Sequence, residues 1–240
     1  MAKNIKKRSA SHIYFGVNKL TGELKHISEV PSGQKCNCIC AACLQPFEAR
    51  KGTRRRHHFA HVSNYECMYA SEVAIYKAFA EALKQSGFLT LSPVMLRFPA
   101  WHDPELLQEA RRLKIDSVAF ECEPLSYPPL LRVTMQGTPL RILLDFDRYY
   151  DDDDRVELAE EAKAEDYSLL LISMPKIEQD TEFTPDRLQS ALQDNDRTEW
   201  VFSRLEEQWK QKYYAVAVSP PEHGTGNLCP ISFGKYKGKY

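Results

Sequence analysis

Four cysteines fall close together in this chain, and three histidines follow them behind a basic run. The cysteines are Cys36, Cys38, Cys40 and Cys43, and the histidines are His57, His58 and His61. A Cys-x-x-Cys turn presents two sulfurs to one ion, and two histidines three or four residues apart supply two nitrogens. The pattern predicts that this segment folds around a metal ion, and zinc is the ion that such ligands favour.

The best single ligand set consists of Cys40, Cys43, His58 and His61. Other choices stay open, because Cys36 and Cys38 are additional sulfurs and His57 pairs with His61 at an equally reasonable spacing. Four protein ligands leave no position for water, so the zinc is expected to be structural. The alternative interpretation is a set of ordinary thiols beside a solvated basic segment.

Composition limits the class of protein. The chain has 240 residues, 43% of them hydrophobic, which is enough for one elaborate domain or two small ones. It contains no apolar run of signal-peptide or membrane-spanning length, so we expect a soluble protein with no membrane partner. Seven cysteines, four of them clustered, favour a reducing cytoplasmic compartment. The cysteines outside the cluster, Cys67, Cys122 and Cys229, are expected to be packing residues.

Charge is segregated along the chain although the net charge is only -1. Residues 1–65 are strongly basic, whereas residues 145–166 are strongly acidic. Four basic residues, Lys51, Arg54, Arg55 and Arg56, lie inside the expected zinc module. Held on a rigid scaffold, they would form a patch for a nucleic-acid backbone, although a solvated face is the simpler interpretation.

Hydrophobic periodicity predicts an α/β (α+β) fold with a mixed central sheet flanked by helices and a small N-terminal β-hairpin and zinc module. Strands are expected at 12–17, 23–27, 89–98, 115–121, 131–135, 140–146 and 168–173, and helices at 70–85, 102–113, 154–166, 185–193 and 198–211. The expected parts are a zinc module at 1–66, an α/β core at 67–176, and helices with a basic aromatic tail at 177–240.

A family resemblance rests on several of these features together. They are the N-terminal hairpin, Cys40-x-x-Cys43, Lys51-Gly52, His58-Phe59-Ala60-His61, and the glutamate-bearing helix that follows. With them, residues 12–175 resemble the competence protein CoiA-like family. The resemblance implies a zinc-binding module joined to a restriction-endonuclease-like core of the PD-(D/E)xK type, acting on DNA as a Mg²⁺-dependent deoxyribonuclease.

In such nucleases carboxylates hold Mg²⁺, which positions water and stabilises charge on the scissile phosphate. The resemblance assigns this role to Glu72, Asp145 and Asp147. In a rearranged site, Glu121 or Glu123 is a candidate for a further carboxylate from the neighbouring strand. The sequence departs from the family pattern at three places. Pro128-Pro129-Leu130 replaces the expected Pro-Asp, and Asp147 stands where the motif has lysine. The helix histidine of the relatives is absent, with Val73 to Tyr76 in its place.

Three interpretations therefore remain. The chain is a metal-dependent DNA nuclease with a rearranged site, or a nuclease-like core without catalysis that binds DNA or a protein. In the third, Asp145, Asp147 and the run Asp151–Asp154 form a solvated strand exit and loop, which we favour for the run itself.

Overall fold

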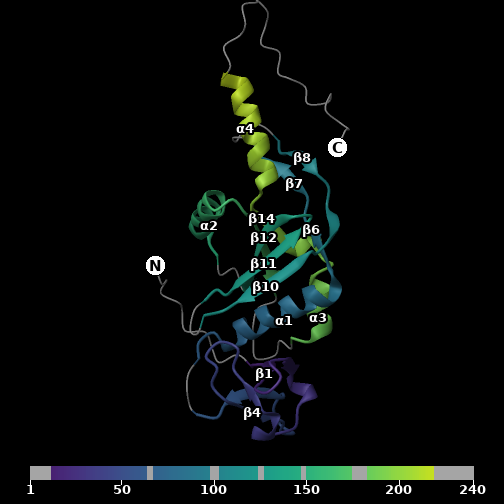
Figure 1. Cartoon of the computed structure of the whole chain (residues 1–240), viewed down its shortest axis with the longest axis vertical. Coiled ribbons are helices and arrows are strands. Elements are labelled where there is room, and N and C mark those ends of the chain that lie inside the picture. Colours follow the sequence, from purple (N-terminus) through teal and green to yellow (C-terminus); the bar gives the residue numbers. More distant parts are fainter. Residues whose placement is uncertain are drawn as a thin grey trace, which may run out of the picture.

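The computed structural model describes residues 12–63, 67–97, 103–123, 127–146, 150–174 and 183–218. Asp147 and the basic aromatic tail lie outside these residues. Figure 1 shows a small N-terminal module at one end of the molecule, a sheet flanked by helices in the middle, and helix α4 at the other end.

A mixed sheet of five strands forms the middle of the molecule. Its strands, in spatial order, are β10 (Ser117–Glu121), β11 (Leu130–Met135), β12 (Thr138–Phe146), β13 (Ser168–Met174) and β14 (Thr198–Phe202). Only β12 and β13 are parallel within it, and the chain crosses between them through helix α2 (Asp152–Ala164). The expected mixed α/β architecture is confirmed at this level.

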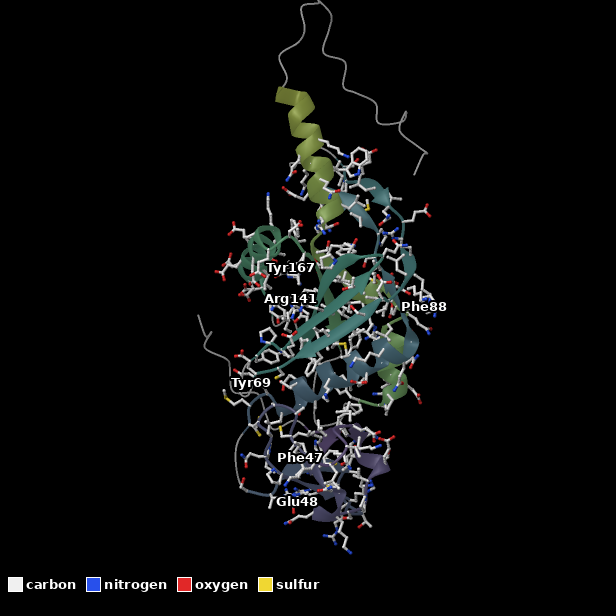
Figure 2. The ribbon with its side chains drawn as sticks, in the orientation of Figure 1. Phe47, Glu48, Tyr69, Phe88, Arg141 and Tyr167 are labelled. Atoms are coloured by element: carbon white, nitrogen blue, oxygen red, sulfur yellow. The ribbon has the colours of Figure 1, made fainter. Side chains whose placement is uncertain are left out.

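Side chains of β12 alternate between two buried faces, as its apolar sequence predicts. Ile142 and Leu144 share a hydrophobic cluster with helix α1 (Ala70–Ser86), whereas Leu143 packs with Ala162 of α2. On the α2 side, Arg141 donates to Glu161 at 2.7 Å, and its guanidinium lies over the Tyr167 ring. Figure 2 labels Arg141 and Tyr167 near α2. The two helices therefore cover opposite faces of the sheet.

The N-terminal module contains a three-stranded sheet and a hairpin. Its elements are β1 (Phe15–Asn18), β2 (Leu24–His26), the 3₁₀ turns η1 (Ile27–Glu29) and η2 (Gln34–Cys36), β3 (Cys38–Ile39), β4 (Phe47–Arg50) and β5 (His58–His61). Phe47 and Phe59 stack in its core with centroids 5.4 Å apart. Its buried side chains belong to the same hydrophobic cluster as α1 and the sheet, so the module is packed onto the core.

A two-part ribbon follows α1. Strand β6 (Phe88–Leu91) pairs with β9 (Arg111–Lys114), and β7 (Val94–Leu96) pairs with β8 (Glu105–Gln108). The helix predicted at 102–113 is therefore wrong. Its residues have helical composition, but cross-strand pairing with β6 and β7 overrides that local preference.

The C-terminal part differs from the prediction in two places. Helix α3 (Pro185–Ala191) lies within the predicted range, and the turn η3 (Asn195–Arg197) follows it. The helix predicted at 198–211 begins instead at Arg204, as α4 (Arg204–Val218), because Thr198–Phe202 completes the sheet as β14.

The acidic run was expected in a loop, but it forms the start of α2. Asp151 is the N-cap: its side chain accepts from the Asp154 amide, and the Asp154 side chain accepts from the Asp151 amide. Carboxylates are favourable at the positive end of a helix dipole, so clustering there offsets part of their mutual repulsion. In the described part of the chain, no helix has the length and apolar character needed to cross a membrane.

Candidate metal centre

Four side chains in the N-terminal module and at its junction with α1 converge on one point. The sulfurs of Cys40, Cys43 and Cys67 and a ring nitrogen of His61 all lie within 4.8 Å of one another. In a tetrahedral zinc site with Zn–S near 2.3 Å and Zn–N near 2.05 Å, ligand atoms are separated by about 3.5–3.8 Å. The four residues are therefore close enough to hold a metal ion.

The Cys40–Cys43 turn follows β3 and is shaped by its backbone. The Leu44 amide donates to the Cys40 carbonyl at 3.0 Å, and the Ala42 amide lies 3.4 Å from the Cys40 sulfur. Leu44 closes the turn with φ of 61°, a left-handed conformation that is uncommon for leucine. The turn thus directs both sulfurs to one side and aims an amide at one of them.

His61 is delivered by the end of strand β5. Phe47 is its cross-strand partner on β4, and the Phe47 ring meets the imidazole edge-on at 4.8 Å. This contact holds Nε2 of His61 at 3.2 Å from the sulfur of Cys43. Burial lowers the pKa of His61, which favours the neutral imidazole that a metal requires.

Cys67 comes from the segment immediately before α1, whose first residue is Ala70. Without a metal its sulfur accepts a hydrogen bond from the Cys40 thiol, which lowers the pKa of Cys67 to about 6. The pKa of Cys40 is raised, mainly by the same hydrogen bond and secondly by burial of its thiol. A divalent cation would take the place of the proton that these two sulfurs share.

The structure brings together Cys40, Cys43 and His61 but places His58 elsewhere. His58 and His61 are both in β5, where residues three apart point to opposite sides of the strand. The Nδ1 atom of His58 lies 2.9 Å from the Arg56 carbonyl, and its ring meets His12 edge-on. Two histidines three residues apart face the same way on a helix, but not on a strand. Because His58 faces away from the group, Cys67 is its fourth member.

The other candidate ligands also lie outside the group. His57 is exposed. The buried thiols of Cys36 and Cys38 donate to the carbonyls of Phe47 and Cys36 respectively. Cys67 was expected to be a packing residue, but it belongs to the metal-ligand group. Its position six residues after His61 was the feature of the sequence that could have indicated this role.

A basic hollow of about 390 Å³ lies on the loop between β4 and β5. Arginine side chains and His58 line it, together with Gly52 and Thr53; the arginines are Arg50, Arg54, Arg55 and Arg56. Lys51 is used differently, because its ammonium group donates to the carbonyls of Ser28 and Val30 and so anchors the residue after β4 to the η1 turn.

The predicted catalytic carboxylates occupy different parts of the core. Glu72 on α1 and Asp145 on β12 are buried, each 4% exposed. Glu121 is exposed on the edge strand β10 and forms an ion pair with Arg132. By strand alternation Asp145 shares the α2 face with Leu143, away from α1. Among the described residues, only the cysteine and histidine group brings three or more potential ligands within 4.8 Å.

Comparisons of this chain with family models, curated proteins and solved structures gave no match. Function is therefore inferred from the chemistry of the sites themselves.

Proposed function

We propose that this chain is a DNA-binding protein in which a structural zinc ion fixes an arginine-bearing hairpin against the phosphate backbone. The observation that carries the proposal is the geometry of that hairpin. Its loop lines the basic hollow with Arg54, Arg55 and Arg56, and its second strand ends at His61 in the metal-ligand group. The same short element thus joins the ion to the arginines.

Zinc suits the donor set. Three thiolates and one neutral imidazole form a common structural zinc site, and four protein ligands leave no open position for a substrate or water. We expect the ion to hold the Cys40–Cys43 turn, the end of β5 and the start of α1 together. Its contribution is to folding, and through folding to the position of the hairpin.

The arginine hollow suits phosphate. Guanidinium groups bind phosphate oxygens with two parallel hydrogen bonds, and a concave surface lets several of them act on one backbone segment. Arg54 and Arg55 are both exposed. The resemblance to CoiA-like proteins supports DNA as the nucleic acid.

The test is fluorescence anisotropy with labelled single-stranded and duplex DNA. Arg54→Gln with Arg55→Gln removes two charges from the hollow, and Lys19→Gln with Lys35→Gln removes two exposed charges from the same module outside it. We expect the first pair to raise Kd at least tenfold and to lower the salt slope by about 1.4 to 1.8. Equal effects of the two pairs, or no DNA binding by the unmodified protein, would contradict the proposal.

Retained nuclease activity is the second candidate, favoured by one arrangement. Tyr76, one helical turn after Glu72, hydrogen-bonds the backbone of Leu144, which directly precedes Asp145. This contact joins the two segments that carry the buried acids, while Asp145 itself lies on the face of β12 away from α1. Among the described residues no three carboxylates converge, and Asp147 lies outside these residues, so we derive no hydrolytic step from the acids.

Cleavage assays with Mg²⁺ or Mn²⁺ against EDTA decide this second candidate. Metal-dependent cutting that is lost in both Glu72→Ala and Asp145→Ala would establish catalysis at these acids. Binding without cutting under any metal would leave the binding function alone.

A further inference from the structure

A second hollow, of about 330 Å³, lies at the opposite end of the sheet from the zinc module. It is bounded by the β6–β9 and β7–β8 ribbon, the turn between β11 and β12, the start of β13, and the first turns of α4. In Figure 1 these elements gather around the end of the sheet from which α4 extends. Its volume is at the lower end of the range for small-molecule sites.

A break in the ribbon forms one wall of this hollow. Ser92 and Pro93 separate β6 from β7, and proline cannot donate to a strand ladder. The Ser92 hydroxyl donates to the Thr198 carbonyl at 2.6 Å, and the Trp200 indole N–H donates to the Ser92 carbonyl at 3.1 Å. These bonds fix the break against β14 and hold the Trp200 ring in the lining.

The floor of the hollow is apolar. Leu91 and Val94 come from the two sides of the break, and Met135, Leu140 and Trp200 come from the central sheet. Leu91, Val94, Met135 and Leu140 are buried in the protein, so this floor is a preformed part of the core surface. It suits the face of one flat, apolar ring system better than a long flexible chain.

The rim is positively charged. Arg111 lies opposite Leu91 on β9, and Arg204 lies at the start of α4. Arg204 already pairs with Asp166 at 2.9 Å, whereas no ion pair is seen for Arg111 among the described residues. The described lining includes no acidic side chain. An anionic group is therefore favoured beside Arg111.

Three glutamines complete the rim: Gln108, Gln136 and Gln208. Each amide offers both a donor and an acceptor without charge, which is the pattern that reads the edge of a nucleobase. They come from the ribbon, the β11–β12 turn and α4, so they reach the hollow from three sides.

We propose that this hollow binds a mononucleotide, with its base on the apolar floor near Trp200, its base edge on the glutamine amides, and its phosphate on Arg111. The apolar floor matches the ring of the base, the glutamine amides match its polar edge, and the Arg111 guanidinium matches the phosphate. The site is separate from the arginine hollow of the zinc module and does not depend on the function proposed for it. The nucleotide is either free or the exposed end of a strand.

Isothermal titration calorimetry with the full chain tests the proposal. The probes are the four ribonucleoside 5′-monophosphates, adenosine, inorganic phosphate, and a short oligonucleotide. Arg111→Gln removes one cation from the hollow and leaves Arg204, which pairs with Asp166. The matched control is Arg112→Gln, since Arg112 neighbours it on β9 but lies over the Phe88 ring at 4.5 Å. Thermal melting of each variant confirms that it is folded.

We expect at least one monophosphate to bind with Kd below about 1 mM, and Arg111→Gln to weaken it at least tenfold while Arg112→Gln changes it less than twofold. Adenosine and phosphate alone are expected to bind at least tenfold more weakly. If the oligonucleotide competes with the monophosphate, and Arg111→Gln abolishes that competition, the natural ligand is the end of a strand. If the oligonucleotide does not compete, the natural ligand is the free nucleotide.

Three results would overturn the proposal. The first is that no monophosphate binds with a Kd below about 1 mM. The second is a Kd that Arg111→Gln leaves unchanged. The third is loss of binding in Arg54→Gln with Arg55→Gln, which would place the ligand in the zinc-module hollow. DNA binding through that module can fail or succeed independently of all three.

Discussion

The hydroxyl of Tyr76 forms hydrogen bonds with both the amide and the carbonyl of Leu144. It accepts from the Leu144 amide at 2.7 Å and donates to the Leu144 carbonyl at 3.3 Å. Extending the β11–β12 register by two residues places Pro129, which has no N–H, opposite Leu144. The Tyr76 hydroxyl from α1 thus gives the Leu144 carbonyl the hydrogen-bond donor that Pro129 lacks.

Tyr76→Phe should lower the free energy of unfolding by about 1–3 kcal/mol, because it leaves a buried amide and carbonyl without their partner. Chemical denaturation measures the change. Tyr69→Phe is the control, since it removes a hydroxyl from a partly exposed ring. Equal losses in the two variants would show that the Leu144 bonds contribute nothing special.

The same tyrosine predicts a pH dependence. Burial raises the pKa of Tyr76 well above its usual value near 10, so the folded protein keeps this proton at pH values where the unfolded chain releases it. The contribution is fully present below pH 10, and the free energy of unfolding falls as pH rises above 10. This part of the fall should be absent in Tyr76→Phe, as denaturation at a series of pH values would reveal.

Zinc content tests the ligand group. We expect about one zinc per chain by elemental analysis, with most of it lost in Cys67→Ser and in His61→Ala. Cys36→Ser and His58→Ala should retain it, because these side chains lie outside the group. Metal loss in His58→Ala together with retention in Cys67→Ser would contradict the geometry.

Gly16 is required by close packing in the module. A Cβ atom there would lie 3.2 Å from both the Cys38 Cβ and the Phe47 ring. Gly16→Ala should therefore destabilise the protein by about 1–3 kcal/mol. Gly52→Ala, with nothing within 4 Å of its Cβ, should change stability by less than about 0.5 kcal/mol, and thermal melting distinguishes the two.

The cap of α2 depends on Asp151. Asp151→Ala should lower the free energy of unfolding, measured by chemical denaturation, by about 0.5–2 kcal/mol, because the Asp154 amide loses its acceptor. Asp153→Ala removes an exposed carboxylate from the same run without removing the cap. If both substitutions had the same effect, the acidic run would act only through its charge.

Elements with strong periodicity were predictable from the sequence. The helix expected at 70–85 is α1 at Ala70–Ser86, and the hairpin arms at 131–135 and 140–146 are β11 and β12. In these segments local preference and burial agree. The ribbon at 105–114 was missed because Leu106 and Leu113 are only partly covered there, and pairing with distant residues decides their conformation.

The metal-ligand group was predictable only in part. Cys40, Cys43 and His61 follow from spacing, but the choice between His58 and Cys67 depends on which side of β5 faces the cysteine turn. That choice is made by the pairing of β5 with β4, where Phe47 lies opposite His61. Spacing along the chain does not carry this information.

The loop that bears Arg54, Arg55 and Arg56 is enclosed by residues of the ligand group, with Cys43 before it and His61 after it. The entropy of closing a loop grows slowly with its length, at about 0.6 kcal/mol for each doubling. With an ion bound, the loop can therefore be lengthened or shortened at little cost to folding. The protein can change the reach and charge of this surface while the frame that carries it stays the same.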